Sequence, residues 1–161
     1  MPTEIESVYK SKFRDIAEGI ADYIRSLGCF DGRSDITVIV EDKGVIEKEI
    51  AQSLSFAGVC ILIAVMGFDR LGSSGPILRG NLKLEFRVME HPFANREKQG
   101  SMTAQQVMEL LIQNTHWRTF DGMDGRPLLF QDFSREDTDE VNVVRGNWSG
   151  EVSLGMVTTQ N

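Results

Sequence analysis

The sequence predicts an α+β fold, in which a mainly antiparallel mixed sheet packs its helices on one face and carries a long exposed hairpin loop. Segments with helical spacing of apolar residues alternate with segments of strand type, and twice two strand-type segments follow each other directly. The chain has 161 residues, of which 41% are hydrophobic, so it can bury one core of ordinary size. Because neither an internal repeat nor a linker interrupts the pattern, we expect residues 1–161 to form a single α+β domain.

Three segments have the periodicity of helices. Thr3 and Glu6 have capping-box spacing and open a long first helix that stops at Gly28. Its apolar face consists of Ile5, Val8, Ile16, Ile20, Ile24 and Leu27. A short second helix is expected over Val45–Leu54, and a third begins at the capping-box pair Thr103 and Gln106 and ends near Trp117.

Strands are expected between these helices. Ile36–Val40 is β-branched, and Val59–Met66 is an uninterrupted apolar run that is typical of a central strand buried on both faces. From Leu82 to Met89 apolar and polar residues alternate, which predicts one buried face and one wet face. The charged positions Lys83, Glu85 and Arg87 would then face water or pair with opposite charges on a neighbouring subunit, and the sequence leaves both interpretations open.

The C-terminal third predicts two more strands. Leu128–Phe130 is a short strand, and the acidic segment Ser134–Glu140 after it is expected to be a solvated connector. The last strand spans Val141–Val157, where Gly146 and Gly150 suggest a bulge or a bend.

The segment FDRLGSSGPILRGN, residues 68–81, is rich in glycine and serine and too long for a tight turn. Such composition is typical of an exposed, mobile loop, here expected to connect the two strands of a hairpin. Its GSSG core, Gly72 to Gly75, lacks the Gly-Lys-Ser/Thr of a phosphate-binding loop. The loop, flanked by Arg70 and Arg79, therefore suits contacts with another protein.

Composition excludes several classes of function. The formal charge of −7 disfavours nucleic acid as the main partner. Cys29 and Cys60 have no metal-binding spacing, so both are expected to be reduced and structural. The N-terminus does not have the pattern of a signal peptide, and Val59–Met66 is far shorter than the roughly 20 residues of a membrane helix, so we expect a cytoplasmic protein without a membrane partner.

No catalytic, cofactor-binding or metal-binding residue is predicted. His91 lies at a strand end before Pro92, and His116 closes a helix, where a partly positive imidazole suits the negative end of the dipole. A GxSxG motif is absent, and neither cysteine has a neighbour that would activate it. The carboxylates Glu136, Asp137, Asp139 and Glu140 do not have the spacing of a calcium loop.

Two passages resemble small phage and prophage neck and tail proteins. One is EDKGVIEKEIAQSLSFAGVCILIAVMGF, in which a helix after "KG" leads into an apolar strand. The other is LKLEFRVMEHPFANREKQGSMTAQQVMELLIQNTHW, a strand that ends in an "E-x-P-x-x-N-R" phrase before a helix. The strand around NVVRGNWSGEVSL is similar in position to the last sheet strand of those proteins.

The resemblance points to the tail-terminator, or tail-completion, family. It implies an α+β subunit without catalysis or cofactor that forms a hexameric ring, terminates the tail tube and joins it to the head connector. The implied partners are further copies of the chain, the tail-tube protein and the head-connector protein, and the implied location is the host cytoplasm and then the virion tail or neck. Pro92–Gly100 would be a second contact element, and Asn95 and Arg96 would bond within their own chain or reach a neighbouring subunit. The candidate contact residues are Arg70, Gly72, Ser73, Ser74, Gly75, Arg79, Asn95 and Arg96.

Two other functions fit the same residues. One is a small cytoplasmic α+β enzyme or ligand-binding domain whose pocket the spacing does not reveal, with His91 or His116 beside carboxylates. The other is a bacterial regulatory interaction module.

Overall fold

The computed structural model describes residues 11–41, 48, 50, 58–91, 102–138 and 140–155. Its elements are α2 (Lys12–Ser26), β1 (Ile36–Val40), β2 (Val59–Ser74), β3 (Ile77–Glu90), α5 (Ala104–Thr115), β4 (Arg118–Thr119), β5 (Pro127–Asp137) and β6 (Asn142–Gly155). The strands form one sheet with the order β1-β2-β3-β6-β5-β4. Only the β1/β2 pair is parallel, so the predicted α+β fold with a mainly antiparallel mixed sheet is confirmed.

The first helix begins later than predicted. Ser11 is the N-cap of α2: its backbone is extended, and its side chain accepts a hydrogen bond from the backbone N–H of Arg14. A single helix running from Thr3 is therefore wrong, while the proposed cap at Thr3 itself lies outside the described residues. The predicted apolar face is confirmed within α2, since Ile16, Ile20 and Ile24 are buried.

Helix α5 begins where the sequence predicts. The Thr103 side chain accepts from the Gln106 backbone N–H, and the Gln106 side chain accepts from the Thr103 backbone N–H, which completes the capping box. The helix ends at Thr115, with His116 as its C-cap.

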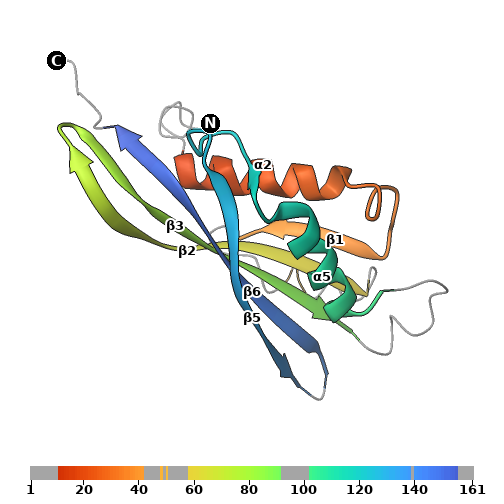
Figure 1. Cartoon of the computed structure of the whole chain (residues 1–161). Helices are drawn as coiled ribbons and strands as arrows, with labels where there is room; N and C mark the ends of the chain where they lie inside the picture. Colours follow the sequence, from red (N-terminus) through yellow and green to blue (C-terminus); the bar gives the residue numbers. More distant parts are fainter. Residues whose placement is uncertain are drawn as a thin grey trace, which may run out of the picture.

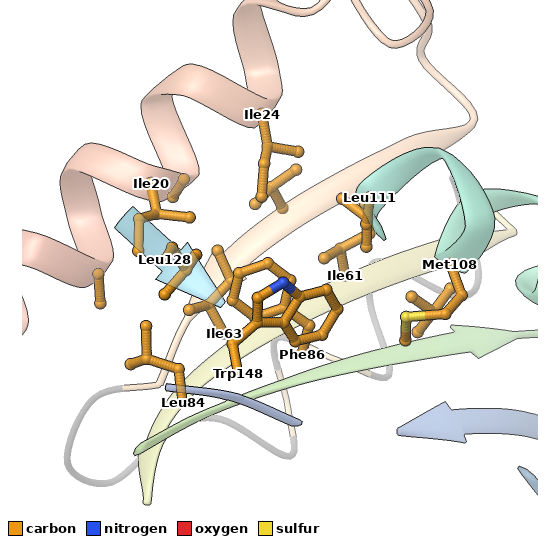
Figure 2. Close-up of a cluster of buried hydrophobic side chains, with 14 of the residues drawn as sticks. Ile20, Ile24, Ile61, Ile63, Leu84, Phe86, Met108, Leu111, Leu128 and Trp148 are labelled. Atoms are coloured by element: carbon orange, nitrogen blue, oxygen red, sulfur yellow. The ribbon is translucent and has the colours of Figure 1, made fainter. Parts of the chain in front are cut away.

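Both helices cover the same face of the sheet and form the main core with it (Figure 1). Phe86 on β3 and Trp148 on β6 stack there with their ring centroids 4.1 Å apart. Figure 2 shows the two rings between side chains of α2 and α5, such as Ile24 and Leu111. Burying large aromatic and branched side chains in this layer is the main source of stability for the fold.

The opposite face of the sheet has a smaller apolar cluster. Cys60, Leu62 and Met89 are buried there, and Ile50 packs against them. The prediction that Val59–Met66 is buried on both faces is therefore confirmed as far as Ala64. Ile50 is helical, as the second predicted helix requires, but most of that helix lies outside the described residues.

The charged positions Lys83, Glu85 and Arg87 of β3 lie on this face, and each pairs with a charge of the same chain. Arg87 donates to the Glu85 carboxylate, 2.8 Å from Nη2, and Glu85 is only 8% exposed. Lys83 pairs with Asp69 at 2.5 Å. Lys83 thus faces water, as one of the two interpretations predicts, whereas the Glu85 carboxylate is buried and bonded to Arg87; pairing with a neighbouring subunit stays a prediction.

The long hairpin exists, but residues 68–81 do not form a long loop. Strand β2 continues to Ser74 and β3 begins at Ile77, so only Gly75 and Pro76 form the turn. Two bulges interrupt the pairing of β2 with β3. In each of them one residue of β2, Met66 or Leu71, has no partner on β3, and the alternation of side chains shifts by one position. The prediction of a loop is wrong because pairing with β3 keeps Gly72, Ser73 and Ser74 extended despite their low strand propensity.

The acidic segment after Phe130 was also assigned wrongly. Ser134 to Asp137 belong to β5 and pair with Arg145 to Asn142 of β6, so the expected connector is reduced to the short turn around Thr138 and Glu140. Long-range pairing with β6 overrides the low strand propensity of these acidic residues.

The two glycines of β6, Gly146 and Gly150, do not form the bulge that the sequence suggests, because the β3/β6 register is continuous at both positions. Instead, each glycine leaves space for a neighbouring side chain. A Cβ at Gly146 would overlap the Trp148 ring and lie 2.9 Å from Met108 Sδ. At Gly150 it would overlap the end of the Met123 side chain.

Gly146→Ala should therefore lower the free energy of unfolding by about 1–3 kcal/mol, because the core cannot expand around the added methyl group. Gly19→Ala is the matched control: nothing lies within 4 Å of a Cβ there, and the exposed helical position should gain roughly 0.5–1 kcal/mol. Urea unfolding of both variants measures the difference. Equal stability of the two would contradict the packing role of Gly146.

Candidate functional site

Three exposed apolar side chains lie on the far half of the β2–β3 hairpin. We call this half, with the β6 segment paired to it, the tongue; it comprises residues 66–83 and 149–155. In Figure 1 the tongue projects beyond the helices at one end of the sheet. Met66 and Leu71, the two bulged residues, are each 56% exposed, and Ile77 beside the turn is 47% exposed. Side chains of this kind at a projecting tip are typical of a protein contact.

The base of the tongue is anchored to α2. The Phe68 ring packs on Phe13 with centroids 5.1 Å apart, and Lys12 Nζ donates to the backbone oxygen of Ser153 at 2.6 Å. Gly80 permits this arrangement, because a Cβ there would overlap the Phe68 ring. The projecting strands are therefore held in a fixed direction by the helix.

The contact residues predicted from the sequence fall into three groups. Arg70 and Arg79 are exposed on the tongue, and the backbones of Gly72, Ser73 and Ser74 are in β2 while Gly75 is in the turn. Arg79 forms an ion pair with Glu151 of β6. Asn95 and Arg96, with the whole of Pro92–Gly100, lie outside the described residues.

Sequence reasoning missed the apolar contact residues. Met66, Leu71 and Ile77 were not selected, because exposure of these side chains depends on where the bulges fall. Phe133, 50% exposed on β5, could have been predicted from the sequence, because a lone aromatic residue among charged residues of a strand is a candidate contact residue. Trp117, at 70% exposure, was treated only as the end of a helix.

The outer edges of β2 and β5 are open over part of their length in the described part of the chain, and the β5 side of β6 has no strand partner beyond Ser149. β1 pairs with β2 only as far as Ile63, so the outer edge of β2 from Ala64 to Ser74 has no described strand beside it. β4 covers only Pro127 and Leu128 of β5, which leaves the outer edge of β5 uncovered by any described strand from Gln131 to Asp137. Open edges have unpaired backbone donors and acceptors and are ready sites for association.

The edge of β1 is protected instead. Arg25 of α2 donates from Nη2 to the backbone oxygen of Val38 at 2.8 Å and from Nη1 to Asp22 at the same distance. A guanidinium across the edge removes an acceptor that an incoming strand would need. The longest open edges in the described part of the chain are those of β2 and β5.

A pocket of about 300 Å³ adjoins this protected edge, lined by Arg25, Phe30, Gly32, Arg33, Ile36, Thr37 and Val38. Arg33 donates to both carboxylate oxygens of Asp35, at 2.9 Å from Nε and 2.8 Å from Nη2. This hydrogen bonding raises the pKa of Arg33 above its ordinary value. Both arginines of the pocket are thus paired with carboxylates of the same chain.

The histidines have structural positions. The backbone N–H of Phe130 donates to His116 Nδ1 at 3.0 Å, and His116 is the C-cap of α5, so this ring joins the helix end to β5. His91 follows the end of β3, and its backbone N–H donates to Gly58 O at 2.9 Å. Cys29 and Cys60 are not disulfide-bonded, as expected. Within the described ranges, no three His, Cys, Asp or Glu side chains are grouped to hold a metal ion, and no helix has the length and hydrophobicity to cross a membrane.

These features define an α+β protein with open stretches of sheet edge on β2 and β5 and a projecting tongue that carries exposed apolar side chains. Comparison with known proteins adds no relative: the chain matches no protein-family model and no curated protein.

Trp117 combines strong exposure with a positive φ of 67°, a backbone conformation in which a side chain is disfavoured and glycine is not. Trp117→Gly should therefore be more stable than Trp117→Ala by about 1 kcal/mol, since both remove the same exposed ring and only glycine relieves the strain. Urea unfolding of the two variants tests this. An alanine variant as stable as the glycine variant would show that the backbone at this position is not strained.

Proposed function

We propose that the protein is a structural assembly protein of a phage or prophage tail or neck, forming a ring that terminates the tail tube and joins it to the head connector. The observation that carries the proposal is the tongue. It projects beyond the helices, carries exposed Leu71 and Ile77, and is held in direction by α2. The resemblance of the two sequence passages to tail-terminator proteins supplies the class of assembly.

The sheet edges support the ring. A ring closes by a heterologous interface, so each subunit needs two different complementary patches. The longest open edges of the described chain belong to β2 and β5, on opposite sides of the sheet order, and Arg25 is bonded to one carbonyl oxygen of the β1 edge. A subunit with two different open edges can contact one neighbour on each side.

The tongue should be essential for assembly. Replacing residues 71–79 by Asn-Gly joins Arg70 to Gly80, which are paired in the native hairpin, through a turn of type I′ geometry. We expect this variant to fold, because the main core is untouched, but to lose ring formation and to leave tails of uncontrolled length when it replaces the native chain. The measurements are mass in solution with and without tail-tube protein, and tail length by electron microscopy.

The matched control replaces only Gly75 and Pro76 by Asn-Gly, which keeps the length of the tongue and every paired residue. It should assemble as the native chain does. Normal tails from the shortened variant would count against the tongue as a contact element, and failure of the control would point to the turn itself.

A small ligand-binding domain is the second candidate, favoured by the pocket beside Thr37, whose volume of about 300 Å³ is at the lower end of the range for ligand sites. Thr37→Phe would fill this pocket and separates the two functions. If ligand binding is the function, Thr37→Phe abolishes it and shortening of the tongue does not. If assembly is the function, shortening of the tongue abolishes assembly and Thr37→Phe does not.

A further inference from the structure

The two projecting hairpins of the sheet carry opposite charge. The first is the tongue; the second is the end of the β5–β6 hairpin, residues 131–145, which we call the acidic hairpin. Figure 1 shows them at opposite ends of the sheet. The chain as a whole has a formal charge of −7, so a basic region in it stands out.

Basic side chains outnumber acidic ones around the tongue. Glu151 forms ion pairs with both Arg79 and Arg126, so one carboxylate faces two guanidinium groups. Lys12 is bonded to a carbonyl oxygen and has no carboxylate partner among the residues that the structure describes. The described charges of the tongue are Arg70, Arg79 and Lys83 against Asp69 and Glu151, and Lys12, Arg126 and Asp124 are bonded to it.

The acidic hairpin has the opposite excess. Asp137 pairs with Arg135, and this hydrogen bonding raises the pKa of Arg135 above its ordinary value. Glu136 pairs with Arg145 at 3.3 Å, so both arginines of the hairpin are used. Asp132 and Glu140 have no cationic partner among the residues that the structure describes; Asp132 accepts only from the Asn147 amide, at 2.6 Å.

Each hairpin also has an apolar centre and an open edge. Phe133 is half-exposed on the acidic hairpin, as Leu71 and Ile77 are on the tongue. In the described part of the chain, neither β2 beyond Ile63 nor β5 beyond Leu128 has a strand on its outer side. An apolar centre with a charged rim is the usual composition of a specific protein interface.

We infer that the acidic hairpin of one copy docks on the tongue of the next, with Phe133 against the apolar side chains of the tongue and the excess charges of opposite sign around them. Like charges disfavour tongue-to-tongue and hairpin-to-hairpin contacts, so each tongue meets an acidic hairpin, as the heterologous interface of a ring requires. This inference rests on the proposal that the chain assembles with itself, and it names the two surfaces that meet.

Charge reversal tests the pairing of the two surfaces. Variant T, altered in the tongue, carries Arg70→Glu and Arg79→Glu. Variant H, altered in the acidic hairpin, carries Asp132→Lys and Glu140→Lys. The two replacements in H break none of the ion pairs described for the acidic hairpin. Each variant alone should associate with itself at least about tenfold more weakly than the native chain does, because its altered surface meets a like charge. An equal mixture should regain association, since the reversed tongue of T fits the reversed hairpin of H and the two native surfaces still fit each other.

The control Glu18→Lys with Glu109→Lys makes the same change of net charge as H, but on the helices, and should associate as the native chain does. Sedimentation at several concentrations and salt levels measures association, and circular dichroism verifies that each variant is folded. The inference is overturned if the native chain stays monomeric at every concentration, if T and H associate as the native chain does, or if the mixture of folded T and H does not recover.

The result is separable from the proposed function. If the shortened tongue gives uncontrolled tails but the mixture of T and H fails to recover, the tail function stands and the docking surfaces are wrong. If the mixture recovers while tails of normal length form with the shortened tongue, the docking stands and the tail function fails.

Discussion

The pairing of β3 along its whole length, with β2 on one side and β6 on the other, is the constraint on which the rest of the structure depends. All fourteen of its residues, Ile77 to Glu90, have partners in both neighbouring strands. This double ladder fixes which side chains face the helices and which face away, because side chains alternate along a paired strand. It also extends past the helices, so the same three strands that contain the core at one end form the tongue at the other.

The core and the projecting regions therefore share one set of strands but differ in what covers them. At the helical end, Phe86 and Trp148 stack under α2 and α5, and Gly146 leaves the room that the indole needs. At the tongue, α2 reaches only as far as the Phe13–Phe68 contact and the Lys12 hydrogen bond. Beyond that point apolar side chains stay exposed, which is unfavourable for an isolated chain and favourable for one that assembles.

The charge distribution follows the same division. Between the two ends, charges on the sheet face away from α2 and α5 are compensated locally, as in the buried pair of Glu85 and Arg87. Toward the two projecting ends the compensation is incomplete and has opposite sign. Exposed ion pairs contribute little to the stability of a folded chain, whereas an excess of charge at an end affects encounter and orientation over a longer distance. We therefore propose that the electrostatics of this protein act on its association more than on its folding.

The sequence by itself determined the α+β class, the apolar face of the first helix from Ile16 onward, the capping box of α5 and the alternation of β3. Each of these depends on neighbouring residues: hydrophobic period, cap chemistry and strand propensity act within a few positions of the chain.

The sequence predicts the candidate site only in part, since it indicates Arg70 and Arg79 but not Leu71, Ile77 and Phe133. Only the tertiary structure decided that residues 68–81 and 134–137 are strands, where the two bulges fall, and that the charged hairpins end up apart. The physical reason is that strand pairing is satisfied by a distant partner, so segments rich in glycine or acidic residues become extended when β3 or β6 supplies the hydrogen bonds that their own sequence cannot.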